Sequence, residues 1–129
     1  MRCLILLFAL ITLPAVAAED YSIISKLHRV ALAQHTYVSD MEQYGVIDYW
    51  TPSLTGDCED YALYMQRLFR IIGYQADIWL VKTETQELHA VLIVNDHWIV
   101  DNRFAQVQTK QTLRYRWVGA VVFYNNTGG

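Results

Sequence analysis

Cysteine is scarce in this chain of 129 residues, which contains only Cys3 and Cys58. Basic residues are also few, with 10 Lys and Arg against 13 Asp and Glu and a net charge of -3. A chain without a basic surplus binds a nucleic-acid backbone poorly, so a nucleic-acid partner is not expected. The sequence also lacks a glycine-rich phosphate loop and paired Cys or His spacings, so it predicts neither an organic cofactor nor a zinc site.

The composition is that of a folded protein. Hydrophobic residues make up 53% of the chain and charged residues 18%, which excludes a disordered or low-complexity chain. The length fits one domain with one core.

The first 18 residues predict a secretory signal peptide. A basic start at Met1-Arg2 precedes an apolar run over 3–16, and small residues follow through Ala18. The run is shorter than the ~20 residues that span a bilayer. We expect removal of residues 1–18, leaving residues 19–129 as a single periplasmic or secreted domain without a stable membrane anchor.

Cleavage would leave Cys58 as the single cysteine of the mature chain. Such a cysteine cannot form an internal disulfide. It is therefore a buried spectator, half of an intermolecular bridge, or a thiol kept for chemistry.

Residue periodicity predicts two helices followed by an antiparallel sheet, an α+β fold. The first helix covers 21–44 and stops at Gly45, and 46–55 is interpreted as a loop. The second helix begins at Cys58, with Asp57 and Asp60 forming a capping box, and ends at Gly73. The sheet has about four strands, expected at 76–81, 89–94, 98–100 and 117–124.

Three residues form a candidate thiol-enzyme site. Cys58 lies in the first turn of a helix, where the helix dipole and a histidinium can lower a thiol pKa from about 8.5. His89 and Asp101 fall on two strands joined by a turn at 95–97, and we expect them nearly opposite each other. A carboxylate there would orient the imidazole. Taken singly, the three also fit structural roles, and His97 is a competing base.

Four sequence blocks together resemble the bacterial transglutaminase-like cysteine proteinase family, which includes LapG-like periplasmic proteases that clip surface adhesins. The blocks are Trp50-Thr51-Pro52, Gly56 through Ala62, His89 through Leu92, and Val100-Asp101-Asn102. The resemblance implies a papain-like, transglutaminase-like fold, in which the catalytic helix packs on the sheet and an N-terminal helix precedes it. It also implies Cys58 as nucleophile, His89 as general base and acid, and Asp101 as orienting carboxylate.

The same resemblance implies a cysteine protease that acts through a thioester on a protein or peptide substrate of the envelope or cell surface. An inner-membrane regulator is the further partner it implies. Three alternatives stay open: a protein-crosslinking transglutaminase, a peptidoglycan amidase, or a non-catalytic binding module on the same fold. Trp50 is interpreted as a core anchor, with an oxyanion donor from its loop as the alternative.

The run Asp57-Cys58-Glu59-Asp60 poses an electrostatic problem, because carboxylates raise the pKa of a neighbouring thiol. A calcium ion would neutralise them. The resemblance implies calcium at the acidic residues on either side of the nucleophile, Asp57 and Glu59. The alternative is that Asp57 and Asp60 only cap the helix and Glu59 is solvated.

Overall fold

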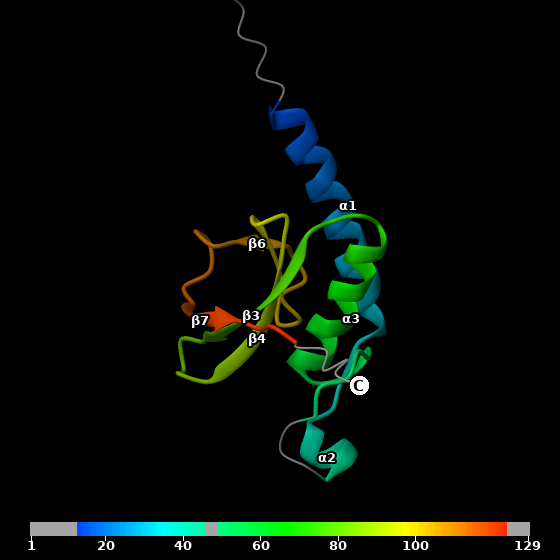
Figure 1. The fold of residues 1–129 in the computed structure, drawn as a ribbon, viewed down its shortest axis with the longest axis vertical. Helices are drawn as coiled ribbons and strands as arrows, with labels where there is room; N and C mark the ends of the chain where they lie inside the picture. Colours follow the sequence, from blue (N-terminus) through cyan, green and yellow to red (C-terminus); the bar gives the residue numbers. More distant parts are fainter. Residues whose placement is uncertain (1–12, 46–48, 124–129) are drawn as a thin grey trace, which may run out of the picture.

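The computed structural model describes residues 13–45 and 49–123, in which two long helices lie on one side of an antiparallel sheet (Figure 1). The helices are α1 (Leu13–Gln34) and α3 (Cys58–Ile71). The sheet order is β6-β5-β4-β3-β7. Its strands are β3 (Ala76–Lys82), β4 (Leu88–Val94), β5 (Trp98–Val100), β6 (Gln108–Thr109) and β7 (Arg116–Ala120). The predicted α+β class is confirmed, and the two-residue edge strand β6 is an addition to the strands expected.

The prediction of one helix over 21–44 is wrong, because the chain leaves the helical path after Gln34. Strand β1 (Thr36–Tyr37) pairs in parallel with β2 (Thr55–Gly56), in the segment expected to be a loop. A new helix, α2 (Asp40–Tyr44), begins at Ser39, whose side chain forms a capping box with Glu42. The expected stop at Gly45 holds for α2, and its φ of 70° is the left-handed conformation that glycine adopts readily.

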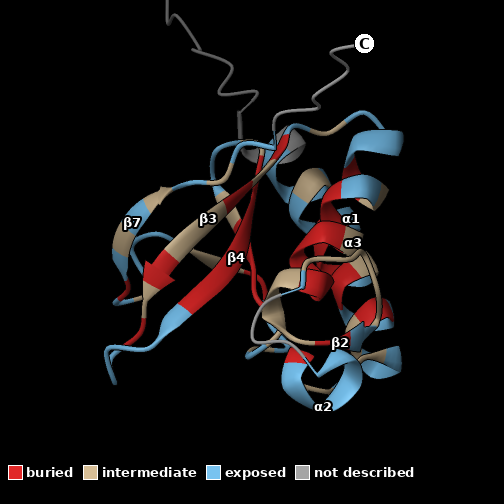
Figure 2. Cartoon of the chain, turned by 60° about the horizontal axis from the view of Figure 1, so that its bottom comes forward, coloured by how far each residue is buried: buried red, intermediate tan, exposed pale blue. Residues whose placement is uncertain are grey.

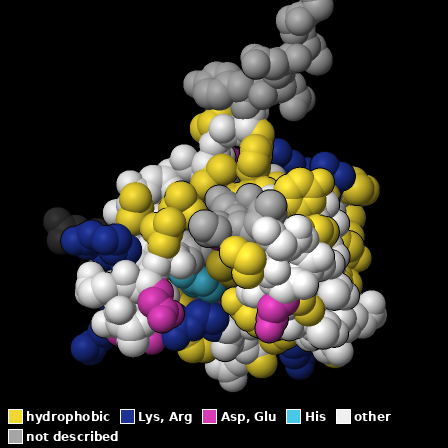
Figure 3. Space-filling model, turned by 90° about the horizontal axis from the view of Figure 1, so that it is seen from below, with side chains coloured by type: hydrophobic (Ala, Val, Ile, Leu, Met, Phe, Trp, Pro, Cys, Tyr) yellow, Lys and Arg dark blue, Asp and Glu magenta, His cyan; other side chains and the backbone are white. Residues whose placement is uncertain are grey.

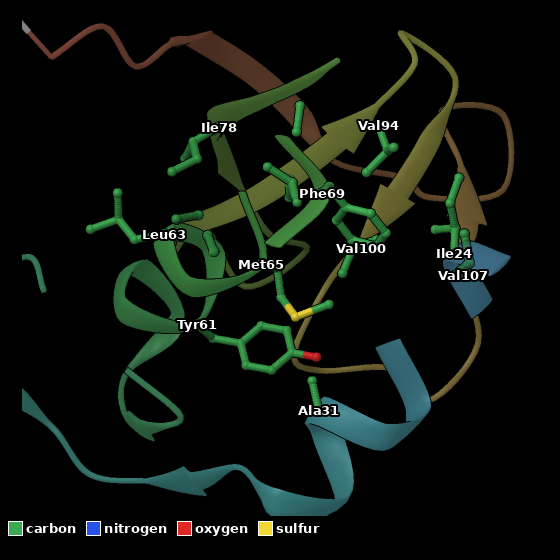
Figure 4. Packing of buried hydrophobic residues seen from close by; sticks show 14 residues of the cluster. Ile24, Ala31, Tyr61, Leu63, Met65, Phe69, Ile78, Val94, Val100 and Val107 are labelled. Atoms are coloured by element: carbon green, nitrogen blue, oxygen red, sulfur yellow. The ribbon is translucent and has the colours of Figure 1, made fainter. Parts of the chain in front are cut away.

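Helix α3 supplies the centre of the core. Asp57 and Asp60 form the predicted capping box, so Cys58 lies in the first turn. Tyr61, Met65 and Phe69, spaced four apart, lie on the inner face of the helix. Figure 4 shows these three side chains directed into the space between α1 and the sheet. Burial of each stabilises the fold by about 1.5–3 kcal/mol.

The β4–β5 hairpin has the predicted turn, with Asn95 and Asp96 at positive φ. Strand β4 is buried along nearly its whole length (Figure 2), and its alternate residues serve two clusters. Ala90, Leu92 and Val94 belong to the α3 side. The other face packs a second cluster formed by Val81, Val91, Ile93, Ile99 and Tyr115.

The two ends of the chain follow the predictions only in part. Strand β7 stops at Ala120, short of the expected end at Tyr124, which lies outside the described residues. Most of the expected signal peptide, residues 1–12, also lies outside them, and α1 runs without a break across the expected junction at 17–18. Within the described residues, no helix has the length and apolarity to cross a membrane.

Candidate active site

The thiol of Cys58 is half-buried at the N-terminus of α3. Its Sγ donates to Oε2 of Glu59 at 3.5 Å. Burial raises the pKa of Cys58 above its ordinary value, and the charge of Glu59 raises it further, against a lowering contribution from the backbone N–H of Ala90. Without a neutralising cation nearby, Cys58 is therefore a protonated thiol at neutral pH.

His89 and Asp101 form a buried hydrogen-bonded pair. Nε2 of His89 lies 2.7 Å from Oδ1 of Asp101, and the two residues are 6% and 1% exposed. The β4–β5 register pairs Leu92 with Val100, so its continuation sets Asp101 opposite Val91 rather than opposite His89. The two side chains are thus diagonal neighbours on one face of the hairpin, a separation that long side chains bridge.

The donor and acceptor roles in this pair fix the imidazole tautomer. An ionised carboxylate can only accept, so Nε2 of His89 carries the hydrogen that it donates to Asp101. In the neutral ring the lone pair is then on Nδ1. Nδ1 is therefore the nitrogen available to take a proton from a thiol.

Cys58 and His89 line the same cavity, which has a volume of about 410 Å³. His35 and Tyr37 form its wall beside Cys58, and Leu88 and Arg103 lie on the side of the sheet. Figure 3 shows histidine side chains recessed in a hollow between hydrophobic, acidic and basic groups. Among the described contacts, the hydrogen bond of Sγ is made to Glu59 and not to His89, so the nucleophile and the base share a cavity but are not yet paired.

Tyr115 and Arg103 complete the surroundings of Asp101, and neither was identified from the sequence. The hydroxyl of Tyr115 donates to Oδ2 of Asp101 at 2.7 Å, and the backbone N–H of Arg103 donates to Oδ1 at 2.9 Å. Burial alone would raise the pKa of Asp101, but the hydrogen bond and charge of His89, with these two donors, hold it below its ordinary value. Asp101 is therefore a carboxylate at neutral pH.

Three carboxylates gather next to the nucleophile: Asp40, Asp57 and Asp60 each place an oxygen within 4.8 Å of the others. Asp40 and Asp60 are buried, and Oδ1 of Asp40 has no hydrogen-bond partner among the described residues. Burial, together with Glu59, raises the pKa of Asp57 to about 7. Such a donor set could hold a hard cation such as calcium.

The predicted metal residues are placed differently from one another. Asp57 belongs to the carboxylate cluster, whereas an oxygen of Glu59 lies at the thiol of Cys58. Asp60 was recognised only as a capping residue, which it also is. Asp40 follows an unexpected break in the helix, so the sequence offered no indication of it.

The remaining candidates have structural surroundings. His97 is exposed in the β4–β5 turn and takes no part in the pair of His89 and Asp101. His28 is fully buried and hydrogen-bonded to Tyr61 and to the carbonyl of Phe104. Trp50 packs against the main core and stacks edge-on with Phe123, as expected for an anchor.

Residues 12–125 match the family model of the bacterial transglutaminase-like cysteine proteinases. The chain belongs to this family. The resemblance seen in the sequence is thereby confirmed, and at the level of the family the chain is assigned to the cysteine proteases.

A solved structure of calcium-bound LapG from Legionella pneumophila has the same fold as this transglutaminase-like proteinase. The TM-score is 0.66 at 20% identity, over 78% of this chain and 65% of the LapG chain. The proteinase thus spans 65% of the length of that structure. No curated protein matches the chain.

Proposed function

We propose that this transglutaminase-like proteinase is a thiol peptidase in which Cys58 is the nucleophile, His89 the general base and acid, and Asp101 the orienting carboxylate. The observation that carries the proposal is the buried 2.7 Å contact between His89 and Asp101 beside a cavity that His89 shares with Cys58. Family membership supports the peptidase assignment.

Acyl transfer follows from the roles of these groups. Nδ1 of His89 takes the proton of Cys58, and Sγ bonds to the carbonyl carbon of a peptide. The resulting oxyanion lies near the first turn of α3, where the N–H groups of Cys58 and Glu59 take no part in the capping box. The imidazolium then protonates the leaving amine as the C–N bond breaks. Water then attacks the thioester carbon while His89 takes its proton, and the C–S bond breaks. This step releases the carboxylic acid and leaves Cys58 as a thiolate beside the imidazolium of His89.

Calcium fits the carboxylate cluster. Oδ1 of Asp40 has no hydrogen-bond partner within 13–45 and 49–123, and the pKa of Asp57 is raised. Both observations indicate acidic groups that lack compensating positive charge. LapG of known structure is a calcium-bound member of the same fold. We propose that Asp40, Asp57 and Asp60 hold calcium here, with Glu59 as a further acidic neighbour. Bound calcium would supply positive charge that offsets the carboxylates around Cys58.

We propose that the protein acts outside the cytoplasm on a protein substrate. The expected signal peptide over 1–18 supports export, and with it a periplasmic or extracellular protein substrate. An inner-membrane regulator would be a partner of the exported domain. The chain carries more acidic than basic residues, which favours a neutral or basic substrate segment.

The experiment that tests the proposed function is alkylation of Cys58 by iodoacetamide across pH, in chelator and in calcium. In chelator we expect slow alkylation at pH 7, because the raised pKa of Cys58 leaves little thiolate. Calcium should speed the reaction by about tenfold or more, because a thiol pKa lowered by one unit raises the thiolate fraction about tenfold. The His89→Ala variant should lose this gain, because the thiolate loses its imidazolium.

The matched control is His97→Ala, which removes an exposed histidine of the same hairpin and should alkylate like the parent protein. Equal alkylation rates for the parent and His89→Ala at every pH would contradict the peptidase proposal and favour a non-catalytic binding module. If Cys58 and His89 form a thiolate–imidazolium pair, incubation with a peptide library, with and without an added primary amine, distinguishes a peptidase from a crosslinking transferase. Cleaved peptides indicate a peptidase, and amine adducts indicate a crosslinking transferase.

Stability should depend on pH through the carboxylate cluster. The folded-state pKa of Asp57, about 7, lies above its ordinary 3.8, so the folded chain binds this proton more tightly than the unfolded chain. In chelator, ionisation of Asp57 should therefore lower the free energy of unfolding as pH rises from about 5 to 7. Two lowered pKa values act in the opposite direction: that of Asp101 below this window, and that of buried His28 within it, because an unfolded histidine takes up a proton below its ordinary 6.5. The contribution of Asp57 is therefore the difference in slope between the parent and Asp57→Asn.

Thermal unfolding at about pH 5 and pH 7 measures this slope. Calcium should remove most of it by favouring the ionised carboxylates, and Asp57→Asn should flatten it in chelator. Asp40→Asn should abolish the effect of calcium on the melting temperature. A slope in Asp57→Asn identical to that of the parent, or an equal calcium effect in Asp40→Asn, would contradict this assignment of the cluster.

A further inference from the structure

Tyr115 precedes β7 and is brought to the candidate triad by the second hydrophobic cluster. It is 8% exposed and packs with Val91 and Ile93, which alternate along β4 on the same face as His89. Its ring meets the ring of His89 edge-on, with centroids 5.9 Å apart and an interplanar angle of 70°. The side chain thus contacts the imidazole and is also hydrogen-bonded to the carboxylate that holds it.

The hydrogen-bond roles around Tyr115 permit one direction of donation. Nη1 of Arg103 lies 3.0 Å from the hydroxyl oxygen, and a guanidinium can only donate. The tyrosine oxygen is therefore the acceptor from Arg103. Its single proton is committed to Oδ2 of Asp101, 2.7 Å away.

The guanidinium of Arg103 is itself held by two further contacts. Its Nη2 pairs with Oε1 of Glu84 at 2.8 Å, and its guanidinium lies over the Tyr115 ring, 5.8 Å from the centroid. This arrangement prevents the hydroxyl of Tyr115 from turning toward another acceptor. The two oxygens of Asp101 are consequently distinguished, because Oδ1 receives His89 and the backbone N–H of Arg103 while Oδ2 receives Tyr115.

We propose that Tyr115 is a positioning residue of the active site, which locks the carboxylate of Asp101 and thereby keeps the hydrogen of His89 on Nε2 and the lone pair on Nδ1. Arg103 keeps the hydroxyl of Tyr115 in the donating direction. The inference rests on the proposed function, since it assigns Tyr115 a role through His89 and Asp101. Tyr115 does not touch the reacting atoms in this role.

Tyr115→Phe tests the inference, because it removes the hydroxyl and keeps the ring that packs on His89. Without this donor, Oδ2 is a buried carboxylate oxygen with no hydrogen-bond partner in the described part of the chain, and the carboxylate is free to rotate or to take a proton. In long-range ¹H–¹⁵N spectra of histidine-labelled protein, we expect the single Nε2–H tautomer of the parent to become a mixture. Alkylation of Cys58 in calcium at pH 7 should slow by about tenfold, which corresponds to the loss of one charge-assisted hydrogen bond.

Tyr74→Phe is the matched control, because it also deletes a hydrogen bond between a tyrosine and an aspartate, here Asp20 at 3.1 Å, away from the site. It should leave the tautomer of His89 and the alkylation rate unchanged. Melting temperatures of both variants separate positioning from a general loss of stability, and the tautomer is read at a temperature where both remain folded.

The outcomes separate the inference from the proposed function. If His89→Ala slows alkylation while Tyr115→Phe keeps the parent tautomer and rate, the role of Tyr115 is refuted and the peptidase proposal stands. If His89→Ala has no effect, the proposed function fails whatever Tyr115→Phe shows. A tautomer mixture in both tyrosine variants would also overturn the inference, since the effect would not be specific to Tyr115.

Discussion

The Asp101→Asn variant is expected to lose peptide hydrolysis by about 10³- to 10⁴-fold while remaining folded. A carboxylate accepts on both oxygens, but an amide has one acceptor and one donor group. If the amide oxygen faces Tyr115, its NH₂ meets His89 and forces the hydrogen onto Nδ1, the wrong nitrogen for a base. If the oxygen faces His89 instead, the hydroxyl of Tyr115 loses its acceptor in a buried place.

The measurement is kcat/KM on a peptide that the parent protein cleaves, together with the ¹H–¹⁵N spectrum of His89. Asp77→Asn is the control, because Asp77 is a half-exposed carboxylate 3.6 Å from Arg70 and away from the site. A rate for Asp101→Asn within a few-fold of the parent would remove Asp101 from the triad.

Gly56→Ala is expected to destabilise the fold by about 3 kcal/mol, a large share of the 5–15 kcal/mol typical of a domain. A Cβ at this position would lie 2.9 Å from Cβ and Cγ of Asp60, and closer still to its Oδ2. Asp60 cannot move without loss, because its carboxylate accepts from the N–H groups of Thr51 and Asp57. The glycine in this sequence block therefore lets β2 pass directly over the capping carboxylate of α3.

Urea unfolding gives the size of this effect, with calcium present and in chelator. Gly119→Ala in β7 is the control, since a Cβ there meets no atom within 4 Å. Gly56→Ala should also weaken calcium binding, because Asp60 belongs to the carboxylate cluster. Equal unfolding free energies for the two alanine variants would contradict the predicted clash.

Local patterns predicted the features that depend on near neighbours in the chain. The capping box of α3 and the β4–β5 turn each depend on a few consecutive residues, and both appear where they were expected. The contact between His89 and Asp101 follows from that turn, although the true register makes them diagonal rather than opposite. The positions of these two residues along the sequence are therefore enough to predict that they pair.

Features that depend on distant residues could not be predicted. Helical periodicity continues past Gln34, but pairing of β1 with β2, 19 residues away, interrupts the helix and carries Asp40 to the acidic cluster. Tyr115 approaches Asp101 from a loop without regular structure, so no period marks it. In both cases tertiary pairing decided the position of a side chain whose local sequence was uninformative.

The two hydrogen bonds of His28 also bear on the order of folding. They join α1 to residues 33 and 76 positions further along the chain, whereas α3, β3, β4 and β5 follow one another directly. Contacts between distant residues require closure of long loops and form late. We expect the hairpin with His89 to protect its amides from hydrogen exchange most strongly, and α1 to undock first. The cavity wall at His35 and Tyr37 directly follows α1, so local unfolding would open the thiol's side of the cavity before it separates the base from its carboxylate.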